Sequence, residues 1–129
     1  MKLIYPAIFH KEDNSVWVEF PDLEGCQSFG DNVQEAYENA QEALEGYCIT
    51  LLEEKHALPK ARDIVTIKPV EGAFTSLVET DLTTHLSKMK SVKKTLTIPA
   101  WMNEMAESQG INFSQTLQNA LKVQLNINV

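Results

Sequence analysis

The stretch KKTLTIP, residues 93–99, decides what the C-terminal part of this chain can fold into. Its alternation is typical of a β-strand, with Lys93, Thr95 and Thr97 on one face and Leu96 and Ile98 on the other. A lone strand presents two open edges, each a row of unpaired backbone groups. The strand therefore needs a partner, and its polar face needs an explanation.

Two short helices are predicted after this strand. Pro99 favours the start of the first helix, and Gly110 ends it. Asn112 is the predicted N-cap of the second helix, with Gln115 at the capping-box position. The predicted apolar stripes are Trp101, Met102, Met105 and Ala106 in the first helix, and Phe113, Leu117, Ala120, Leu121 and Leu125 in the second.

A unit of about forty residues in the order strand, helix, helix rarely buries enough apolar surface to fold alone. We therefore predict a twofold dimer in which the strand pairs antiparallel with its own copy and four helices share one core. Single dimers and dimers of dimers are both compatible with this pattern. The predicted dimer contacts are Leu96, Ile98, Trp101, Leu117 and Leu121.

The polar face of such a two-stranded ribbon fits the major groove of DNA, where Lys93, Thr95 and Thr97 could hydrogen-bond to base edges. The free N–H groups at the start of the second helix would hold phosphate, at Asn112, Phe113 and Ser114. A plain dimerisation module with a merely solvated face explains the pattern equally well. Residues 91–129 hold only three basic residues, which is a thin electrostatic footprint for DNA binding.

The preceding residues predict an α+β unit. Three strands are expected within 2–11, 16–20 and 26–29, with Pro6 at a sheet edge or a bulge because it cannot donate to a ladder. Asp31 is the predicted N-cap of a long helix that ends near Lys55.

Residues 64–81 read as one or two further strands. The resulting order is strand, strand, strand, helix, strand, with the helix packed on one face of the sheet. A short helix and hinge are expected in the polar stretch from Leu82 to Ser91.

Composition narrows the classes of function. The chain has 129 residues and a net charge of −7; residues 1–90 hold 8 Lys and Arg against 16 Asp and Glu. An acidic first part suits a basic partner. The sequence shows no membrane-spanning run and no signal peptide, so we expect a cytoplasmic protein. The two cysteines fit no zinc or redox spacing and the three histidines are scattered, so we expect no metal and no cofactor.

The C-terminal part, residues 93–125, resembles a ribbon-helix-helix DNA-binding domain. The resemblance rests on the basic strand that ends in TIP (97–99), a first helix closed by a glycine, and GINFSQTLQNAL (110–121). Many members of that family carry Arg-Ser near the start of the second helix, where this chain has Phe113 and Ser114. Phosphate contact would therefore depend more on backbone amides.

The N-terminal part resembles HicB-type antitoxins. The residues that carry this resemblance are YPAIFHK (5–11), VWVEFPDLEGC (16–26), FGD (29–31), QEAYENAQEALEGY (34–47) and LVETDL (77–82). The resemblance implies a partial ribonuclease H-like βββαβ domain over 1–82 that has lost catalysis, a linker over 83–92, and the ribbon-helix-helix domain over 93–129. It also implies a HicA-type toxin as partner, a small basic ribonuclease whose active site is blocked, and operator DNA through which the complex represses its own operon.

For the toxin contact we single out Trp17, Glu19, Asp22 and Glu24, a tryptophan with acidic neighbours on one hairpin and its loop. Packing of Trp17 on the second face of the sheet and solvation of the loop explain these residues without a partner. The carboxylates are not predicted to converge as two-metal hydrolysis requires, so we expect no enzyme activity. The competing class is a stand-alone dimeric repressor whose N-terminal domain senses a small ligand.

Overall fold

The structure, a computed structural model, describes residues 1–125; the last four residues of the predicted range 93–129 lie outside the described residues. Four strands, four α-helices and one 3₁₀ turn follow one another along this part of the chain. Their bounds are β1 Lys2–Glu12, β2 Ser15–Glu19, β3 Gln27–Gly30, α1 Val33–Glu53, η1 Ile64–Thr66, β4 Ala73–Asp81, α2 Thr83–Ser87, α3 Ala100–Ser108 and α4 Phe113–Gln124.

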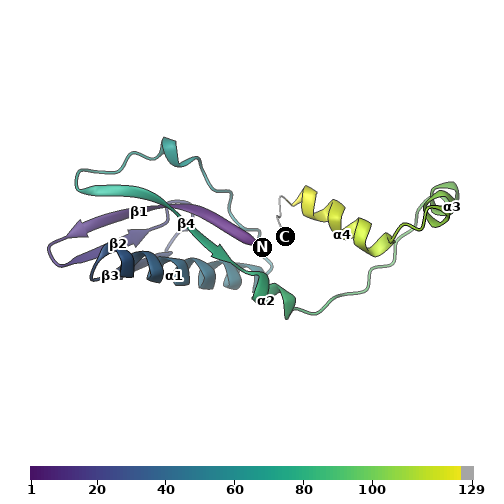
Figure 1. The fold of residues 1–129 in the computed structure, drawn as a ribbon, viewed down its shortest axis with the longest axis horizontal. Coiled ribbons are helices and arrows are strands. Elements are labelled where there is room, and N and C mark those ends of the chain that lie inside the picture. The colour runs from purple at the N-terminus through teal and green to yellow at the C-terminus, as the bar shows by residue number, and fades with distance from the viewer. Residues whose placement is uncertain (126–129) are drawn as a thin grey trace.

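The four strands form one antiparallel sheet in the order β3-β2-β1-β4. α1 lies along one face of this sheet, and α3 and α4 stand apart from it at the end of an extended segment (Figure 1). The predicted order of strand, strand, strand, helix, strand is confirmed. No helix among residues 1–125 is long and apolar enough to cross a membrane.

The core lies between α1 and the sheet. α1 presents Ala36, Ala40, Leu44 and Cys48 to it at helical spacing, and all four are fully buried. The facing strands supply Tyr5, Ala7, Phe9, Val16, Val18 and Val78. Both cysteines belong to this core, and burial raises the pKa of Cys26 to about 11 and that of Cys48 to about 12. They are packing residues.

The start of α1 differs from the prediction by one residue. Asn32, and not Asp31, is the N-cap: its side-chain oxygen accepts from the backbone N–H of Glu35 at 2.8 Å. Asp and Asn are equally good N-caps, so the sequence alone does not distinguish between these two neighbouring positions. The helix ends at Glu53, two residues before the predicted Lys55.

Pro6 lies in the middle of β1, which is an inner strand of the sheet and not an edge. β2 pairs only with residues 8–12 of β1, so the segment that carries Pro6 has β4 on one side and no ladder on the other. A missing N–H is better tolerated in a segment with one ladder than between two paired strands. The expectation of an edge position is therefore wrong for the strand as a whole and right for this segment.

Of the one or two strands predicted within 64–81, the structure has one. Only Ala73–Asp81 pairs in the sheet, along most of β1. Residues 64–66 form the 3₁₀ turn η1, because Asp63 caps it: its side chain accepts from Val65 N and its carbonyl from Thr66 N. A local side-chain hydrogen bond thus overrides the β-branched composition of this segment.

The predicted strand at 93–99 does not form within the single chain. Residues 90–98 make no backbone hydrogen bond among the described residues, and α3 begins directly after Pro99. The two helices do match prediction. Gly110, with φ of 67°, follows α3, and Asn112 caps α4 by accepting from Gln115 N at 3.0 Å.

One close approach positions α1 on the sheet. A Cβ placed on Gly30, the last residue of β3, would lie 2.4 Å from the backbone nitrogen of Ala36 in the first turn of α1. Backbone atoms cannot step aside as a flexible side chain can. We expect Gly30→Ala to lower the free energy of unfolding by about 3 kcal/mol, at the upper end of overpacking costs. Denaturant unfolding followed by far-UV circular dichroism measures this loss.

Gly46→Ala is the matched control. Gly46 lies on the exposed side of α1, and its added Cβ meets no atom within 4 Å. The same glycine-to-alanine change should there stabilise the protein, by about 0.5–1 kcal/mol, because it removes a helix-interior glycine. Equal stability of Gly30→Ala and wild type would refute the proposed tight contact between β3 and α1.

Candidate functional site

The face of the sheet opposite α1 is the candidate partner surface. No α-helix packs against it in the described residues, and α1 lies on the other side (Figure 1). The register of the strands shows that Ile8, Trp17 and Phe29 project from this face. We call its β1–β3 part the aromatic face; it consists of Ile8, His10, Glu12, Ser15, Trp17, Glu19, Gln27 and Phe29.

Trp17 is held at the centre of the aromatic face by its cross-strand neighbours. It pairs with His10 of β1 and with Phe29 of β3. The rings of His10 and Trp17 stack with centroids 3.9 Å apart and planes 10° from parallel. Such pairing holds the half-buried indole in one orientation before any partner arrives, which reduces the entropy cost of binding.

Carboxylates flank the aromatic side chains. Glu19 Oε2 lies 3.3 Å from His10 Nε2, and Glu12 stands at the end of the hairpin. The aromatic face has no lysine or arginine. Apolar area bordered by negative charge suits a basic partner.

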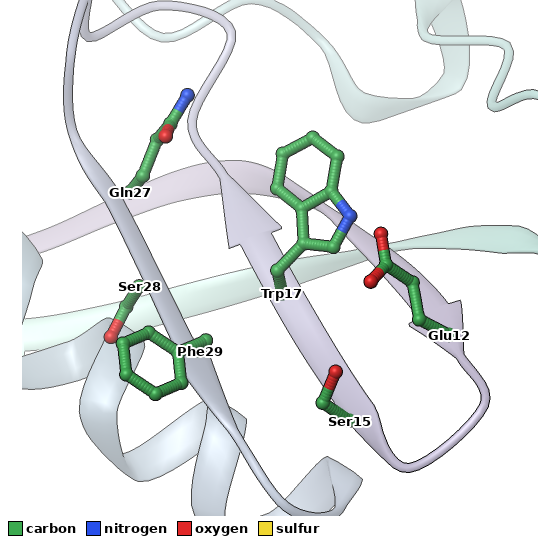
Figure 2. A pocket seen from close by; sticks show the side chains of 6 residues that line it. All are labelled: Glu12, Ser15, Trp17, Gln27, Ser28 and Phe29. Atoms are coloured by element: carbon green, nitrogen blue, oxygen red, sulfur yellow. The ribbon is translucent and has the colours of Figure 1, made fainter.

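An open hollow of about 460 Å³ lies over the edge of this surface. The residues that line it come from β1, β2 and β3, and Figure 2 shows Trp17 between Glu12 of β1 and the side chains of β3. Phe29 is 71% exposed, an unusual fraction for a phenylalanine in a sheet. The hollow could receive a protruding side chain of a partner.

The four residues predicted for toxin contact do not share one environment. Trp17 and Glu19 lie on the aromatic face. Asp22 lies in the β2–β3 loop, where Arg62 Nε donates to its carboxylate at 2.7 Å and the Arg62 backbone N–H at 3.2 Å. Its side chain is only 8% exposed. Glu24 is exposed in the same loop.

The ion pair of Asp22 with Arg62 has a structural role. It ties the segment after α1 to the β2–β3 loop, beside the hydrogen bond that Tyr5 donates to the carbonyl of Pro59. A carboxylate already bound by a guanidinium is a poor contact for a second cation. No group of three or more His, Cys, Asp or Glu within residues 1–125 is arranged to hold a metal ion.

A second surface lies on the C-terminal helices. Leu96 is 57% exposed, Trp101 61% and Met105 56%, and no residue of α3 or α4 is buried. The other predicted dimer contacts, Ile98, Leu117 and Leu121, are exposed as well. Two amphipathic helices with their apolar stripes in water are unstable alone, so this region needs a covering partner.

The residues predicted to contact DNA are all exposed. Lys93, Thr95 and Thr97 lie in the unpaired extended segment before α3. At the start of α4 the side chain of Asn112 accepts a hydrogen bond from the backbone N–H of Gln115. The N–H groups of Phe113 and Ser114 have no partner in the described residues. The helix therefore presents free donors there.

The match to a known family spans nearly all of this arrangement. Residues 5–121 match the family described as "HicB_like antitoxin of bacterial toxin-antitoxin system". The chain belongs to this HicB-like antitoxin family. The resemblance seen in the sequence is thereby confirmed at the level of the family.

Solved structures agree with this assignment. A toxin–antitoxin complex from Streptococcus pneumoniae contains a chain 29% identical to this one, with a TM-score of 0.62 over 96% of this chain and 99% of that one. The Burkholderia pseudomallei antitoxin HicB is 26% identical, with a TM-score of 0.61 over 92% and 96% of the two chains. A chain of the HicA3 and HicB3 toxin–antitoxin complex is 28% identical, with a TM-score of 0.53 over 61% and 99%.

Among the members of the aromatic face that sequence reasoning missed are His10, Glu12 and Phe29. They lie on different strands from Trp17, so only the strand register brings them beside it. The alternation of apolar and polar residues in each strand places them on the face away from the core. This alternation is the sequence feature from which they could have been predicted. The pairing of Asp22 with Arg62, 40 residues apart, had no signal in the sequence.

Proposed function

We propose that this HicB-like protein neutralises a HicA-type toxin by covering its active site, and represses its own operon by binding operator DNA as a ribbon-helix-helix dimer. The observation that carries the first half is the aromatic face, an open surface with flanking carboxylates in a member of an antitoxin family. The solved HicA3 and HicB3 complex supports a partner of this kind.

The toxin would bind on the aromatic face. Trp17 supplies a large, pre-oriented apolar anchor, and Glu19 and Glu12 supply charge for a basic ribonuclease. The exposed Glu24 could add a contact at the rim. Asp22, although predicted from the sequence as a contact, contributes instead by holding the loop in shape through Arg62.

The dimer would form through residues 93–125. The backbone of residues 90–98 is unpaired, and the apolar stripes of α3 and α4 are exposed. A second copy of the chain would pair with this backbone and cover these stripes at the same time. In this arrangement Leu96 and Ile98 face the helices while Lys93, Thr95 and Thr97 face the DNA. This proposal includes the division of the chain into 1–82, 83–92 and 93–129.

We also propose that the sheet and α1 form a partial ribonuclease H-like unit that does not cut nucleic acid. Hydrolysis by two metals needs several carboxylates around one metal pair. Here Asp22 is bound to Arg62 and Glu19 contacts His10, so the acidic residues nearest in sequence point to different neighbours.

Co-expression with a small basic protein sought in the reading frames next to this gene tests the antitoxin function. With one chain tagged, a stoichiometric complex in which the neighbour's ribonuclease activity is silent is expected. Free activity of the neighbour in the presence of this chain would overturn the toxin-binding proposal. A stand-alone dimeric repressor with a sensory N-terminal domain would then be the better explanation, provided that operator binding persists.

Thr95→Ala with Thr97→Ala tests the groove contacts. Removing two hydroxyl groups from the ribbon's polar face should weaken operator binding by about 1–3 kcal/mol, roughly 5- to 150-fold, while the dimer persists. Fluorescence anisotropy with an operator duplex measures the affinity, and light scattering after size exclusion measures the dimer. Operator affinity equal to that of wild type would remove these residues from the interface.

A further inference from the structure

The positive charge of this acidic chain is concentrated in one short segment. Between Leu82 and Asn103 the sequence has four lysines and neither Asp nor Glu. The remainder of the chain has seven Lys and Arg against 18 Asp and Glu. We call residues 88–94, with the sequence KMKSVKK, the lysine tether.

The lysine tether is open to a partner along its whole length. Every residue from 88 to 94 is exposed, and the backbone of residues 90–94 has no hydrogen bond within the described residues. Figure 1 shows this segment leaving α2 and running extended to α3, away from the sheet. None of its four lysines forms an ion pair with any of residues 1–125.

We propose that the lysine tether is a second DNA contact, in which Lys88 and Lys90 bind backbone phosphates beside the base pairs that the ribbon reads. This inference rests on the proposed DNA-binding function and extends it. The contact is electrostatic and independent of base sequence, since a lysine ammonium recognises phosphate as a point charge.

The spacing fits this role. Lys88 precedes Lys93 by five residues, and an extended chain advances by about 3.3 Å per residue, so the tether reaches at most roughly 17 Å from the ribbon. Successive phosphates of one DNA strand are separated by about 3.4 Å along the helix axis, so this reach covers about five base pairs. In a twofold dimer the two tethers would leave the ribbon toward opposite flanks of the site.

A polyanion is a better partner for the tether than the protein's own acidic part. Residues 1–82 hold 6 Lys and Arg against 16 Asp and Glu, so that part repels DNA. If the tether served to bind that acidic surface, contacts between its lysines and carboxylates would be expected, and its four lysines make none with residues 1–125. The tether instead places cationic charge between the acidic part and the DNA.

The test compares Lys88→Gln/Lys90→Gln with Lys60→Gln/Lys68→Gln in the full chain. The control removes two exposed lysines, which form no ion pair among residues 1–125, from the loop around η1. Binding is measured by fluorescence anisotropy at several salt concentrations. The probes are a duplex from immediately upstream of the gene and a scrambled duplex of the same composition. Light scattering checks that both variants remain dimers.

Loss of four phosphate contacts per dimer should reduce the slope of log K against log salt by about 3 to 4. Lys88→Gln/Lys90→Gln should lose affinity for both duplexes by the same factor, and the control should keep the wild-type slope. An unchanged slope in the tether variant, or an equal loss in the control, would overturn the tether while leaving the operator function intact. If wild-type protein binds neither duplex, the DNA-binding function itself is wrong and the tether falls with it.

Discussion

Trp17→Ala is expected to weaken toxin binding by about 2 kcal/mol or more, roughly 30-fold in Kd, as removal of an interface anchor does. The indole lies at the centre of the aromatic face, stacked on His10 and flanked by Glu19. Its removal takes away contact area and the neighbour that orients His10. Titration calorimetry with the co-expressed toxin measures the change in affinity, and residual ribonuclease activity reports the functional consequence.

Phe74→Ala is the matched control for Trp17→Ala. Phe74 is an aromatic residue of the same sheet, but it pairs and stacks with Phe9 on the face toward α1. Its loss should reduce stability and leave the toxin affinity of the folded protein unchanged. If Phe74→Ala impairs toxin binding as much as Trp17→Ala does, the toxin does not select the aromatic face. Circular dichroism on both variants separates loss of fold from loss of contact.

Leu96→Asp is expected to abolish the dimer. In the proposed ribbon Leu96 faces the shared helical core, so the new carboxylate would be buried without a partner, which costs several kcal/mol. The dimer Kd should rise by at least about 100-fold, and operator affinity should fall with it because one copy reads only half of the site. Analytical ultracentrifugation measures the first quantity, and anisotropy with the operator duplex the second.

Thr95→Asp provides the contrast to Leu96→Asp. It introduces the same carboxylate one residue away, on the opposite face of the predicted strand. That variant should remain a dimer and lose operator binding, because a carboxylate in the groove is repelled by phosphate. Dimers of equal stability in the two variants would show that Leu96 does not face a core. Toxin binding should persist in the Thr95 variant, since the aromatic face is untouched.

Local sequence patterns predicted the helices and strands well where a single feature, such as an apolar period or a capping residue, marked the element. The apolar period of α1, the cap at Asn112 and the glycine after α3 all correspond to observed features. Errors arose where two local signals competed. Asp31 and Asn32 are both good caps, and Asp63 turns a β-branched segment into η1.

The sequence by itself determined the order of the strands and helices in residues 1–82, the two helices after Pro99, the apolar faces of these elements and the family to which the chain belongs. These depend on spacing along the chain, which backbone geometry converts directly into faces. Only the tertiary structure decided that Trp17 meets His10 and Phe29, and that Asp22 is occupied by Arg62. Strand register and contacts between distant residues depend on how the whole core packs, and no local window of the sequence contains that information.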